Sequence, residues 1–204
     1  MSTTSLGRFG ASFMTTRAAL ALPLLLAAVL LVANETRVRT TEAALTRWAL
    51  DPITPGRAAA AGPVVYFGIG TPELVGLDIT TLCSTMVLVV PLLVLAAAAV
   101  VITRARIGRV LVGLTAAASL ASTCNIVRFV SAAWAYTQYG REGFDLVHRY
   151  IGSVFVLLGF GAAIALLLII ALRQPRAYTA TPITPSPAVL RRDLRARRSR
   201  KVRR

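Results

Sequence analysis

The sequence is poor in the residues from which most enzyme sites are built. Its 204 residues include one histidine, two cysteines and eight acidic residues. Two cysteines are too few for a disulfide framework, and their spacing matches no zinc motif. The chain also contains no glycine-rich phosphate loop, Walker motif or HExxH motif. We therefore expect no metal ion and no cofactor.

Apolar residues, by contrast, are abundant and occur in blocks. The chain is 56% hydrophobic with a mean hydropathy of +0.68, which is too apolar for an ordinary soluble domain of this length. Each block is long enough to cross a hydrocarbon core of about 30 Å as a helix. The sequence therefore predicts an all-α fold, a polytopic membrane helix bundle over residues 1–172, with four spans at about 17–34, 82–102, 110–134 and 150–172.

The first apolar block has two possible interpretations. A signal peptide would be followed by a small-x-small cleavage site, but Leu31-Val32-Ala33 places leucine where a small residue is preferred. We favour an uncleaved helix.

Basic residues near the span ends predict the orientation of the bundle. The connection 103–109 (TRARIGR) holds three arginines and no acid, the N-terminus holds Arg8 and Arg17, and the C-terminal segment is strongly basic. Cytoplasmic connections carry such an excess of arginine and lysine. The mixed-sign connections, 35–81 and the short loop near Gly140, are then outside. We expect a multi-pass protein of the plasma membrane with both termini in the cytoplasm.

The net charge of +15 comes mostly from the C-terminal end. Residues 173–204 hold eleven Lys/Arg and one acid, and they combine a Pro/Thr-rich linker with a basic tail. The linker has too few large apolar residues to pack, which predicts disorder. A basic segment next to a membrane helix favours contact with anionic lipid on the cytoplasmic side. Nucleic-acid binding by this tail is the minor alternative, and no nucleic-acid partner is expected.

The predicted outer segment, 35–81, is not uniformly polar. Residues 62–81 (GPVVYFGIGTPELVGLDITT) alternate apolar patches with glycine and proline. This pattern fits a segment that lies on the membrane surface, and it fits equally a segment that folds over the end of the bundle.

An isolated arginine in the third span raises the question of function. Arg128 lies in a long apolar run with no acidic residue nearby in sequence. A charge at the centre of a bilayer costs about 2.5 kcal/mol or more, so we expect Arg128 to lie near a surface and to have a task. It follows Arg109 by 19 residues, about 28 Å along a helix, which puts it near the outer face.

The same count from cytoplasmic arginines places two more reactive residues at the outer face. Cys83 lies 21 residues before Arg104, about 31 Å, and His148 lies 25 residues before Arg173, about 37 Å. Taken singly, each of these residue types has an ordinary role in packing or at an interface. A cysteine, a histidine and a cation together are the parts for thiol chemistry, because thiolate is the reactive form and histidine moves protons near neutral pH.

A disulfide between Cys83 and Cys124 is the competing explanation. Cys124 lies 15 residues after Arg109, about 22 Å along its helix, so the two cysteines differ in depth by about 9 Å. Bridged Cα atoms lie within about 7 Å of each other, so this offset disfavours the bridge.

The ordered set of motifs resembles the exosortase/archaeosortase family. Cys83-Ser84 opens one span, Asn125-Ile126-Val127-Arg128 lies near the end of the next, and His148 opens the last. Members of this family are integral membrane enzymes with a Cys, Arg, His triad, thought to act as cysteine transpeptidases. Their substrates are exported proteins with a C-terminal sorting signal, which consists of a short motif, a membrane helix and a basic cluster. The resemblance covers roughly residues 78–172.

The resemblance implies a role for each matched residue. Cys83 would be the nucleophile that forms a thioester, His148 the general acid and base, and Arg128 the group that stabilises the oxyanion or orients the substrate. Asn125, three residues before Arg128 on the same helix face, and Ser84 would support them. The implied function is a membrane cysteine protease or transpeptidase whose active site faces outside and transfers cleaved proteins to an acceptor.

Two features depart from the family pattern. Thr85 stands two residues after the cysteine, where the family usually has glycine, and a branched side chain alters how closely a substrate backbone approaches. Four spans make this chain a short form, since many members have about eight. These departures concern substrate and efficiency more than the triad.

Two non-enzymatic interpretations stay open. A small membrane scaffold or assembly subunit would need only the apolar bundle and the basic tail, and its Cys83 would be replaceable. A small transporter or channel would line an anion path with Arg128, but the sequence offers no second intramembrane charge and no broken pair of helices for it.

Overall fold

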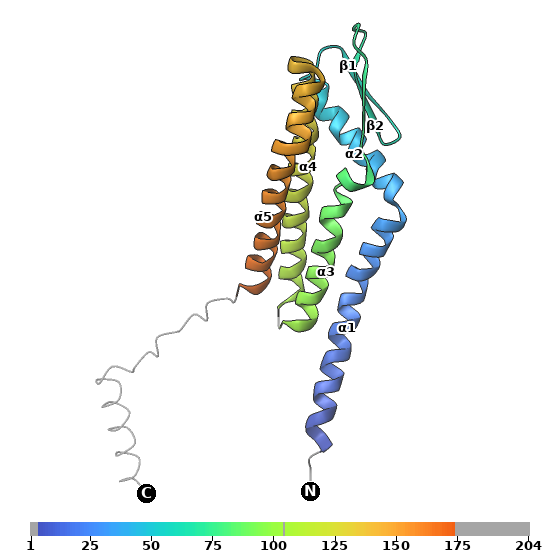
Figure 1. The fold of residues 1–204 in the computed structure, drawn as a ribbon. Coiled ribbons are helices and arrows are strands. Elements are labelled where there is room, and N and C mark those ends of the chain that lie inside the picture. Colours follow the sequence, from blue (N-terminus) through green and yellow to red (C-terminus); the bar gives the residue numbers. More distant parts are fainter. Residues whose placement is uncertain (1–3, 104, 174–204) are drawn as a thin grey trace, which may run out of the picture. The chain divides into compact units, whose positions relative to one another are not determined.

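The computed structural model describes residues 4–103 and 105–173, with side chains from residue 17 onward. Within this part the chain is mostly helical, and a small three-stranded sheet lies at one end of the helices (Figure 1). The linker and basic tail expected over 173–204 lie outside the described residues, apart from Arg173.

Two helices form the N-terminal part. α1 (Thr4–Ala33) carries the first apolar block and ends before Asn34, whose side-chain amide donates to the Leu30 carbonyl at 2.8 Å. α2 (Glu35–Leu50) follows at once, and the chain bends by 78° between the two helices. The helix buries one stripe of side chains and leaves the rest polar or exposed, as expected of a surface helix; the buried residues are Glu42, Ala43, Thr46 and Leu50.

The sheet follows α2 and is antiparallel throughout. β1 (Arg57–Ala61), β2 (Val64–Ile69) and β3 (Val75–Asp78) are neighbours both in sequence and in the sheet. Gly62, with φ 58°, supplies the left-handed backbone of the turn between β1 and β2. The all-α expectation is therefore wrong for this segment. Strands this short, interrupted by glycine and proline, do not produce a clear alternating pattern.

Three apolar helices complete the described part. A 3-10 turn (Thr81–Cys83) leads into α3 (Met86–Ile102). α4 (Ile107–Asp145) continues through a π-helical turn (Leu146–Ile151) into α5 (Gly152–Leu172). The loop expected near Gly140 is instead helical on both sides of a single break, at which Gly140 has φ 64°. One glycine is enough for this break because it adopts left-handed backbone without a steric penalty.

α4 and α5 lie antiparallel and close together (Figure 1). A Cβ added at Gly113 of α4 would lie 3.1 Å from the Leu167 carbonyl oxygen, and one added at Gly159 of α5 would lie 2.6 Å from Cys124 Sγ. Because Gly113 precedes Cys124 while Leu167 follows Gly159, the two helices run in opposite directions. Small residues at the contacts allow the two helix backbones to approach this closely.

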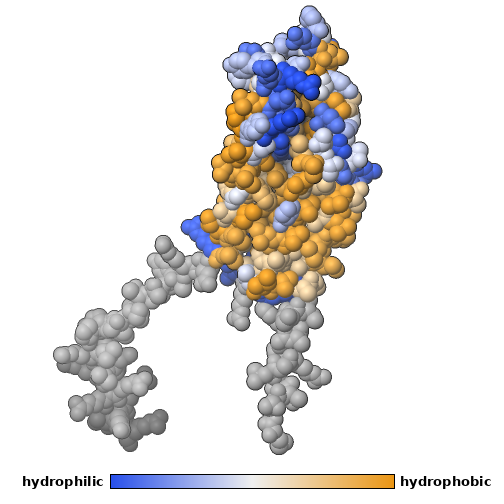
Figure 2. Space-filling view, viewed as in Figure 1, coloured by the Kyte–Doolittle hydropathy of each residue, from blue (hydrophilic) through white to orange (hydrophobic). Residues whose placement is uncertain are grey.

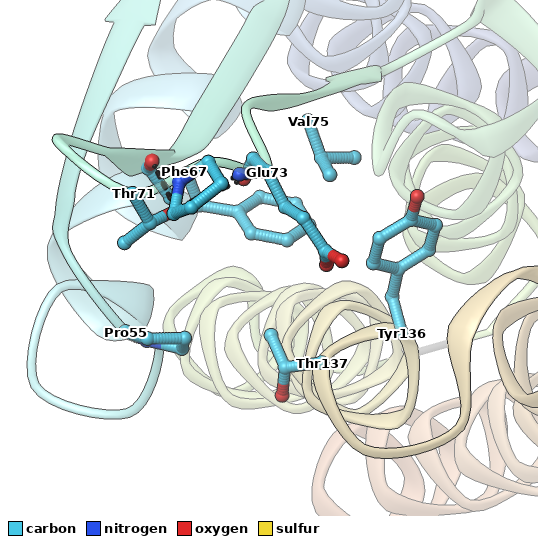
Figure 3. Close-up of a pocket in the computed structure, with 9 residues that line it drawn as sticks. Pro55, Phe67, Thr71, Glu73, Val75, Tyr136 and Thr137 are labelled. Atoms are coloured by element: carbon cyan, nitrogen blue, oxygen red, sulfur yellow. Dashed lines mark hydrogen bonds between the residues drawn. The ribbon is translucent and has the colours of Figure 1, made fainter.

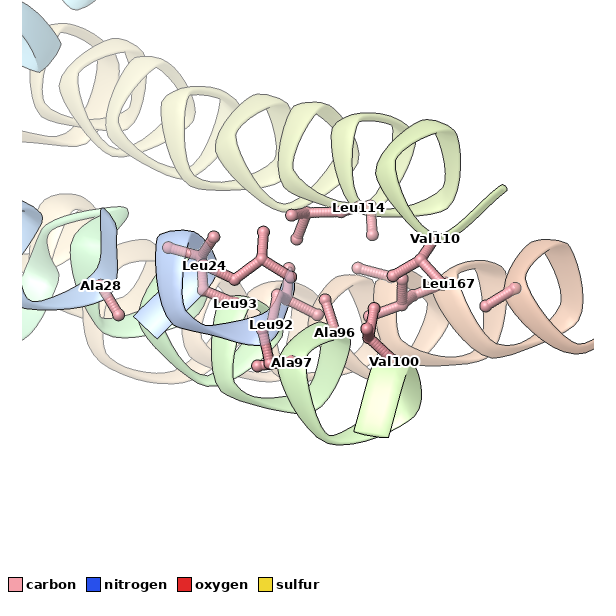
Figure 4. Packing of buried hydrophobic residues seen from close by; sticks show 14 of the residues in the cluster. Leu24, Ala28, Leu92, Leu93, Ala96, Ala97, Val100, Val110, Leu114 and Leu167 are labelled. Atoms are coloured by element: carbon pink, nitrogen blue, oxygen red, sulfur yellow. The ribbon is translucent and has the colours of Figure 1, made fainter. Parts of the chain in front are cut away.

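Two apolar cores hold the described part together. The bundle core joins α1, α3, α4 and α5 and consists mainly of alanine, leucine and valine side chains (Figure 4). The cap core joins α2 and the sheet, which we call the cap, to α4, and its largest buried side chains include Val65, Ile79 and Phe129. Residues 35–81, the segment predicted to be outside, therefore pack over the end of α4.

Apolar side chains also cover much of the outside of the helices. On the face in Figure 2, hydrophobic residues cover the helices, and hydrophilic residues gather toward the sheet. By length and composition, one helical stretch, Ile107–Leu172, is apolar enough to cross a membrane, and the bent pair of α1 and α2 adds a second if it counts as one span. That stretch contains both α4 and α5. Met86–Ile102 is apolar but shorter.

Candidate active site

Cys83 ends the 3-10 turn that joins the sheet to α3. The turn is closed by the Cys83 N–H, which donates to the Thr80 carbonyl at 3.0 Å, and by the Ser84 N–H, which donates to the Thr81 carbonyl at 3.2 Å. The thiol is half-buried and packs against the cap core. The cysteine is therefore held in a short connection between the two cores, immediately before the first turn of α3.

Arg128 reaches this thiol from α4. Its Nη2 lies 3.9 Å from Cys83 Sγ, and it donates to the His148 carbonyl at 3.2 Å. Gly152 at the start of α5 leaves room for the arginine stem, since a Cβ there would lie 2.7 Å from Arg128 Cγ. The buried Nε of Arg128 has no hydrogen-bond partner among the described residues. This N–H is a buried donor whose hydrogen-bonding capacity is not used by the described residues.

His148 completes the group from the π-helical turn between α4 and α5. Its Nε2 lies 3.8 Å from Cys83 Sγ and 3.5 Å from Arg128 Nη2. The imidazole stacks on Phe144, with ring centroids 5.1 Å apart, and on Phe129, with centroids 6.2 Å apart. The two aromatic rings hold the imidazole plane in place. Its buried Nδ1 has no hydrogen-bond partner in the described part of the chain.

The neighbours of His148 favour its neutral form. Arg128 can only donate, so a favourable contact with Nε2 assigns the lone pair to Nε2 and the proton to Nδ1. Burial lowers the pKa of His148 from its ordinary value of 6.5, and the charges of Arg128 and Arg149 lower it further, while Asp145 acts in the opposite direction. His148 lies between the two predicted spans 110–134 and 150–172. A neutral imidazole with its lone pair toward a thiol is the form that a general base requires.

Asn125 and Ser84, the two supporting residues, lie beside the triad. Asn125 is 1% exposed, and its side-chain amide donates to the Cys83 carbonyl at 2.8 Å. Ser84 is 2% exposed, and its hydroxyl accepts from the N–H of Met86, the first residue of α3, at 3.3 Å. Thr85, at the position where the family usually has glycine, is also buried, and its Oγ1 lies 3.3 Å from the Asn125 amide nitrogen.

Glu42 is the site residue that the sequence did not single out. It is 5% exposed, and its carboxylate accepts hydrogen bonds from the Ser84 hydroxyl and the Thr85 N–H. In the sequence it stood only as one of several acids in a mixed-sign segment. A signal was present nonetheless, because Glu42 precedes Thr46 and Leu50 at helical spacing and so lies on the buried stripe of α2.

Cys124 lies apart from this group. It is 8% exposed and lies in the contact between α4 and α5, against Gly159. Both Cys83 and Cys124 are free thiols. The alternative of a Cys83–Cys124 disulfide is therefore wrong. The reason is the one indicated by the sequence: Cys124 is one helical turn below Arg128, the residue that contacts Cys83.

A pocket of about 230 Å³ opens between the sheet and α4 (Figure 3). Its walls include Phe67, Glu73, Val75 and Tyr136. The Tyr136 ring packs edge-on against Phe144, with centroids 6.4 Å apart, and Phe144 stacks in turn on His148. A row of aromatic rings therefore connects the pocket with the imidazole.

Comparisons of the chain with models of protein families, with curated proteins and with solved structures find no match. Among the described residues, no group of three or more His, Cys, Asp or Glu side chains is placed to hold a metal ion.

Proposed function

We propose that this chain is a cysteine transpeptidase of the plasma membrane, of the exosortase/archaeosortase type, with Cys83, Arg128 and His148 as its catalytic residues. The single observation that supports this most is the convergence of one thiol, one guanidinium and the only histidine, from three separate elements, within 3.9 Å of one another. A thiol, a proton carrier and an oxyanion donor are what acyl transfer through a thioester requires.

Acylation begins with proton transfer from Cys83 to His148. Nε2 takes the thiol proton, and the thiolate attacks the carbonyl carbon of the scissile peptide bond. The oxyanion that forms is stabilised by the Arg128 guanidinium, whose Nη2 lies beside the sulfur and whose Nε has a free N–H. When the C–N bond breaks, His148 returns its proton to the leaving amine, and a thioester on Cys83 remains.

Deacylation reverses these roles. His148 takes a proton from the acceptor amine, the amine attacks the thioester carbonyl, and the C–S bond breaks. Cys83 leaves as thiolate and regains its proton from His148, so the enzyme is restored without a metal, an oxidant or a reductant. Hydrolysis results if water takes the place of the acceptor amine.

The proposed substrates are exported proteins with a C-terminal sorting signal, and the proposed setting is a four-span bundle with its active site outside. Apolar side chains on the outer surface of the helices support a lipid environment; examples are Leu22, Val29, Val112, Leu157 and Ile169, all at least 62% exposed. α3, with 17 residues, extends about 26 Å, which a bilayer accommodates by small changes in thickness. In this orientation the cap covers the outer end, and a substrate helix in the bilayer presents its scissile bond at that level.

Replacing the nucleophile tests the proposal directly. In the native host, Cys83→Ala is compared with Cys124→Ala, and the processing of membrane-anchored surface proteins is followed by gel shift and mass spectrometry. We expect Cys83→Ala to lower processing by several orders of magnitude, because no other group forms the thioester, and Cys124→Ala to process normally. If both variants are present at normal levels and process every precursor, the catalytic role fails, and a small membrane scaffold or assembly subunit takes its place.

A further inference from the structure

The proposed chemistry makes no use of the one buried carboxylate that contacts the site. Glu42 is 5% exposed and lies on α2, in a segment to which the family resemblance does not extend. A buried carboxylate is costly unless hydrogen bonds satisfy its oxygens. Glu42 has no ion pair among the described residues, so its hydrogen bonds account for its burial.

Both oxygens of this carboxylate face the segment that follows the nucleophile. Oε2 accepts from the Ser84 hydroxyl at 2.5 Å, and Oε1 accepts from the Thr85 N–H at 2.7 Å. Thr85 immediately precedes α3, so its N–H is one of the amide groups at a helix start that no carbonyl of the helix can satisfy. A carboxylate at this end also interacts favourably with the helix dipole. Glu42 therefore fixes the start of α3 from outside that helix.

The same carboxylate also contacts α4. The Asn125 amide nitrogen lies 3.3 Å from Glu42 Oε1 and donates to the Cys83 carbonyl at 2.8 Å. Asn125 is 1% exposed, so its orientation is set by these partners rather than by solvent. Glu42 thus acts on the nucleophile along two routes, through the backbone at Thr85 and through the amide of Asn125.

We infer that Glu42 is a positioning residue for Cys83: its carboxylate ties α2, the start of α3 and Asn125 of α4 together, and it holds the thiol against Arg128 and His148. It touches no reacting atom. Removing it leaves two buried donors without an acceptor, namely the Ser84 hydroxyl and the Thr85 N–H, and takes away one of the three acceptors around the Asn125 amide. The segment that carries Cys83 would then move away from the triad.

Thiol alkylation tests this inference without any knowledge of the substrate. The full chain, in native membranes at pH 8, is treated with N-ethylmaleimide, and mass spectrometry follows the modification of Cys83 and Cys124 separately. In Glu42→Ala we expect Cys83 to react several-fold faster than in the unaltered chain, because the released segment exposes a thiol that is now half-buried. We expect Cys124 to stay protected, because it lies in the packed contact between α4 and α5.

Two further variants sharpen the test. Glu42→Gln keeps an oxygen that accepts from the Thr85 N–H, and its side-chain amide can donate to the Ser84 hydroxyl. The rate at which N-ethylmaleimide modifies Cys83 in this variant should therefore lie near that of the unaltered chain. Glu142→Ala removes an exposed acid from α4 and should change neither thiol. An unchanged Cys83 rate in Glu42→Ala overturns the inference.

If Glu42→Ala exposes Cys124 as well as Cys83, the variant has lost its fold more widely, and the milder variant Glu42→Asp is used instead. This variant keeps the charge but is shorter by one methylene, so it cannot reach Ser84 and Thr85 together. Faster Cys83 modification with Cys124 protected supports positioning, and an unchanged Cys83 rate refutes it. The inference goes beyond the proposed function and is separable from it: if Cys83→Ala processes precursors normally while Glu42→Ala still releases Cys83, the transpeptidase proposal fails and the positioning role stands.

Discussion

At the scale of single residues, His148 is the group whose behaviour the structure constrains most. Two stacked aromatic rings fix its plane, Cys83 and Arg128 occupy the side of Nε2, and Nδ1 is buried. Because its folded pKa is lowered below 6.5, the neutral form is favoured in the fold. Stability from this residue is therefore present above about pH 6.5 and is lost as the pH falls through the folded pKa.

The titration of His148 can be observed without ambiguity, because the chain has one histidine. In protein labelled with 15N-histidine and purified without a histidine tag, we expect the imidazole to titrate below 6.5. Arg149→Ala should move the pKa upward, because it removes a positive charge, and Asp145→Asn should move it downward. Both shifts should be small, since the Arg149 side chain is 68% exposed and solvent screens its charge. A pKa at or above 6.5 in the unaltered chain would contradict this description.

The lowered pKa of His148 also predicts that activity is lost toward low pH. If His148 is the general base, the acid limb of the pH–rate profile reports its deprotonation in the free enzyme. We expect processing by purified protein to fall only when the pH drops below 6.5, and the midpoint to follow the NMR titration through the Arg149 and Asp145 variants. A midpoint that stays constant while the imidazole pKa moves would remove His148 from the role of base.

At the scale of elements, the close contact between α4 and α5 depends on glycine at position 159, where any larger residue would meet Cys124. Gly159→Ala would place a Cβ 2.6 Å from Cys124 Sγ and 3.0 Å from Cys124 Cβ, and overpacking of this kind costs about 1–3 kcal/mol. Gly161→Ala is the matched control, since a Cβ there meets no atom within 4 Å. We expect thermal unfolding in detergent to show a lower midpoint for Gly159→Ala only.

Adding Cys124→Ala to Gly159→Ala should recover part of the lost stability, because the closest atom is removed. The remaining 3.0 Å contact with the Cβ at position 124 prevents full recovery. The double variant thus measures a coupling between two helices that meet again at the site, one helical turn further along α4. Equal midpoints for Gly159→Ala and Gly161→Ala would show that the helices are further apart than described.

At the scale of the whole molecule, the proposed orientation can be tested by thiol labelling in intact cells. Cysteine is placed at Leu74, which is 62% exposed on the cap, or at Arg106, which is exposed between α3 and α4, in a Cys83→Ala, Cys124→Ala background. A membrane-impermeant maleimide should label the Leu74 variant in intact cells and the Arg106 variant only after permeabilisation. Labelling of the Arg106 variant in intact cells would contradict the proposed topology.

The helices were more predictable than the cap, for a physical reason. The helices predicted at 82–102 and 150–172 agree with α3 and α5 within about four residues, because long apolar runs are a strong signal, and their role as membrane spans stays a prediction. Counting helical rise from the arginines predicted to be cytoplasmic placed Cys83, Arg128 and His148 at one level, and the three side chains lie within 3.9 Å of one another. The strands gave no comparable pattern. The helical spacing of Glu42 with Thr46 and Leu50 indicates burial, but its partners Ser84, Thr85 and Asn125 lie in other elements, so local spacing does not indicate its role at the site.

The separation of Glu42 from its partners also bears on the order of assembly. Asn125 follows Glu42 by 83 residues, which is roughly 4–17 s of synthesis at about 5–20 residues per second. Ser84 and Thr85 are made about halfway through that interval, so in its second half the Glu42 carboxylate lacks only the amide of α4. The cap therefore closes only after the third apolar helix has been made, and His148 follows later still. The thiol is completed before its base, so a nascent chain holds Cys83 without the group that would activate it.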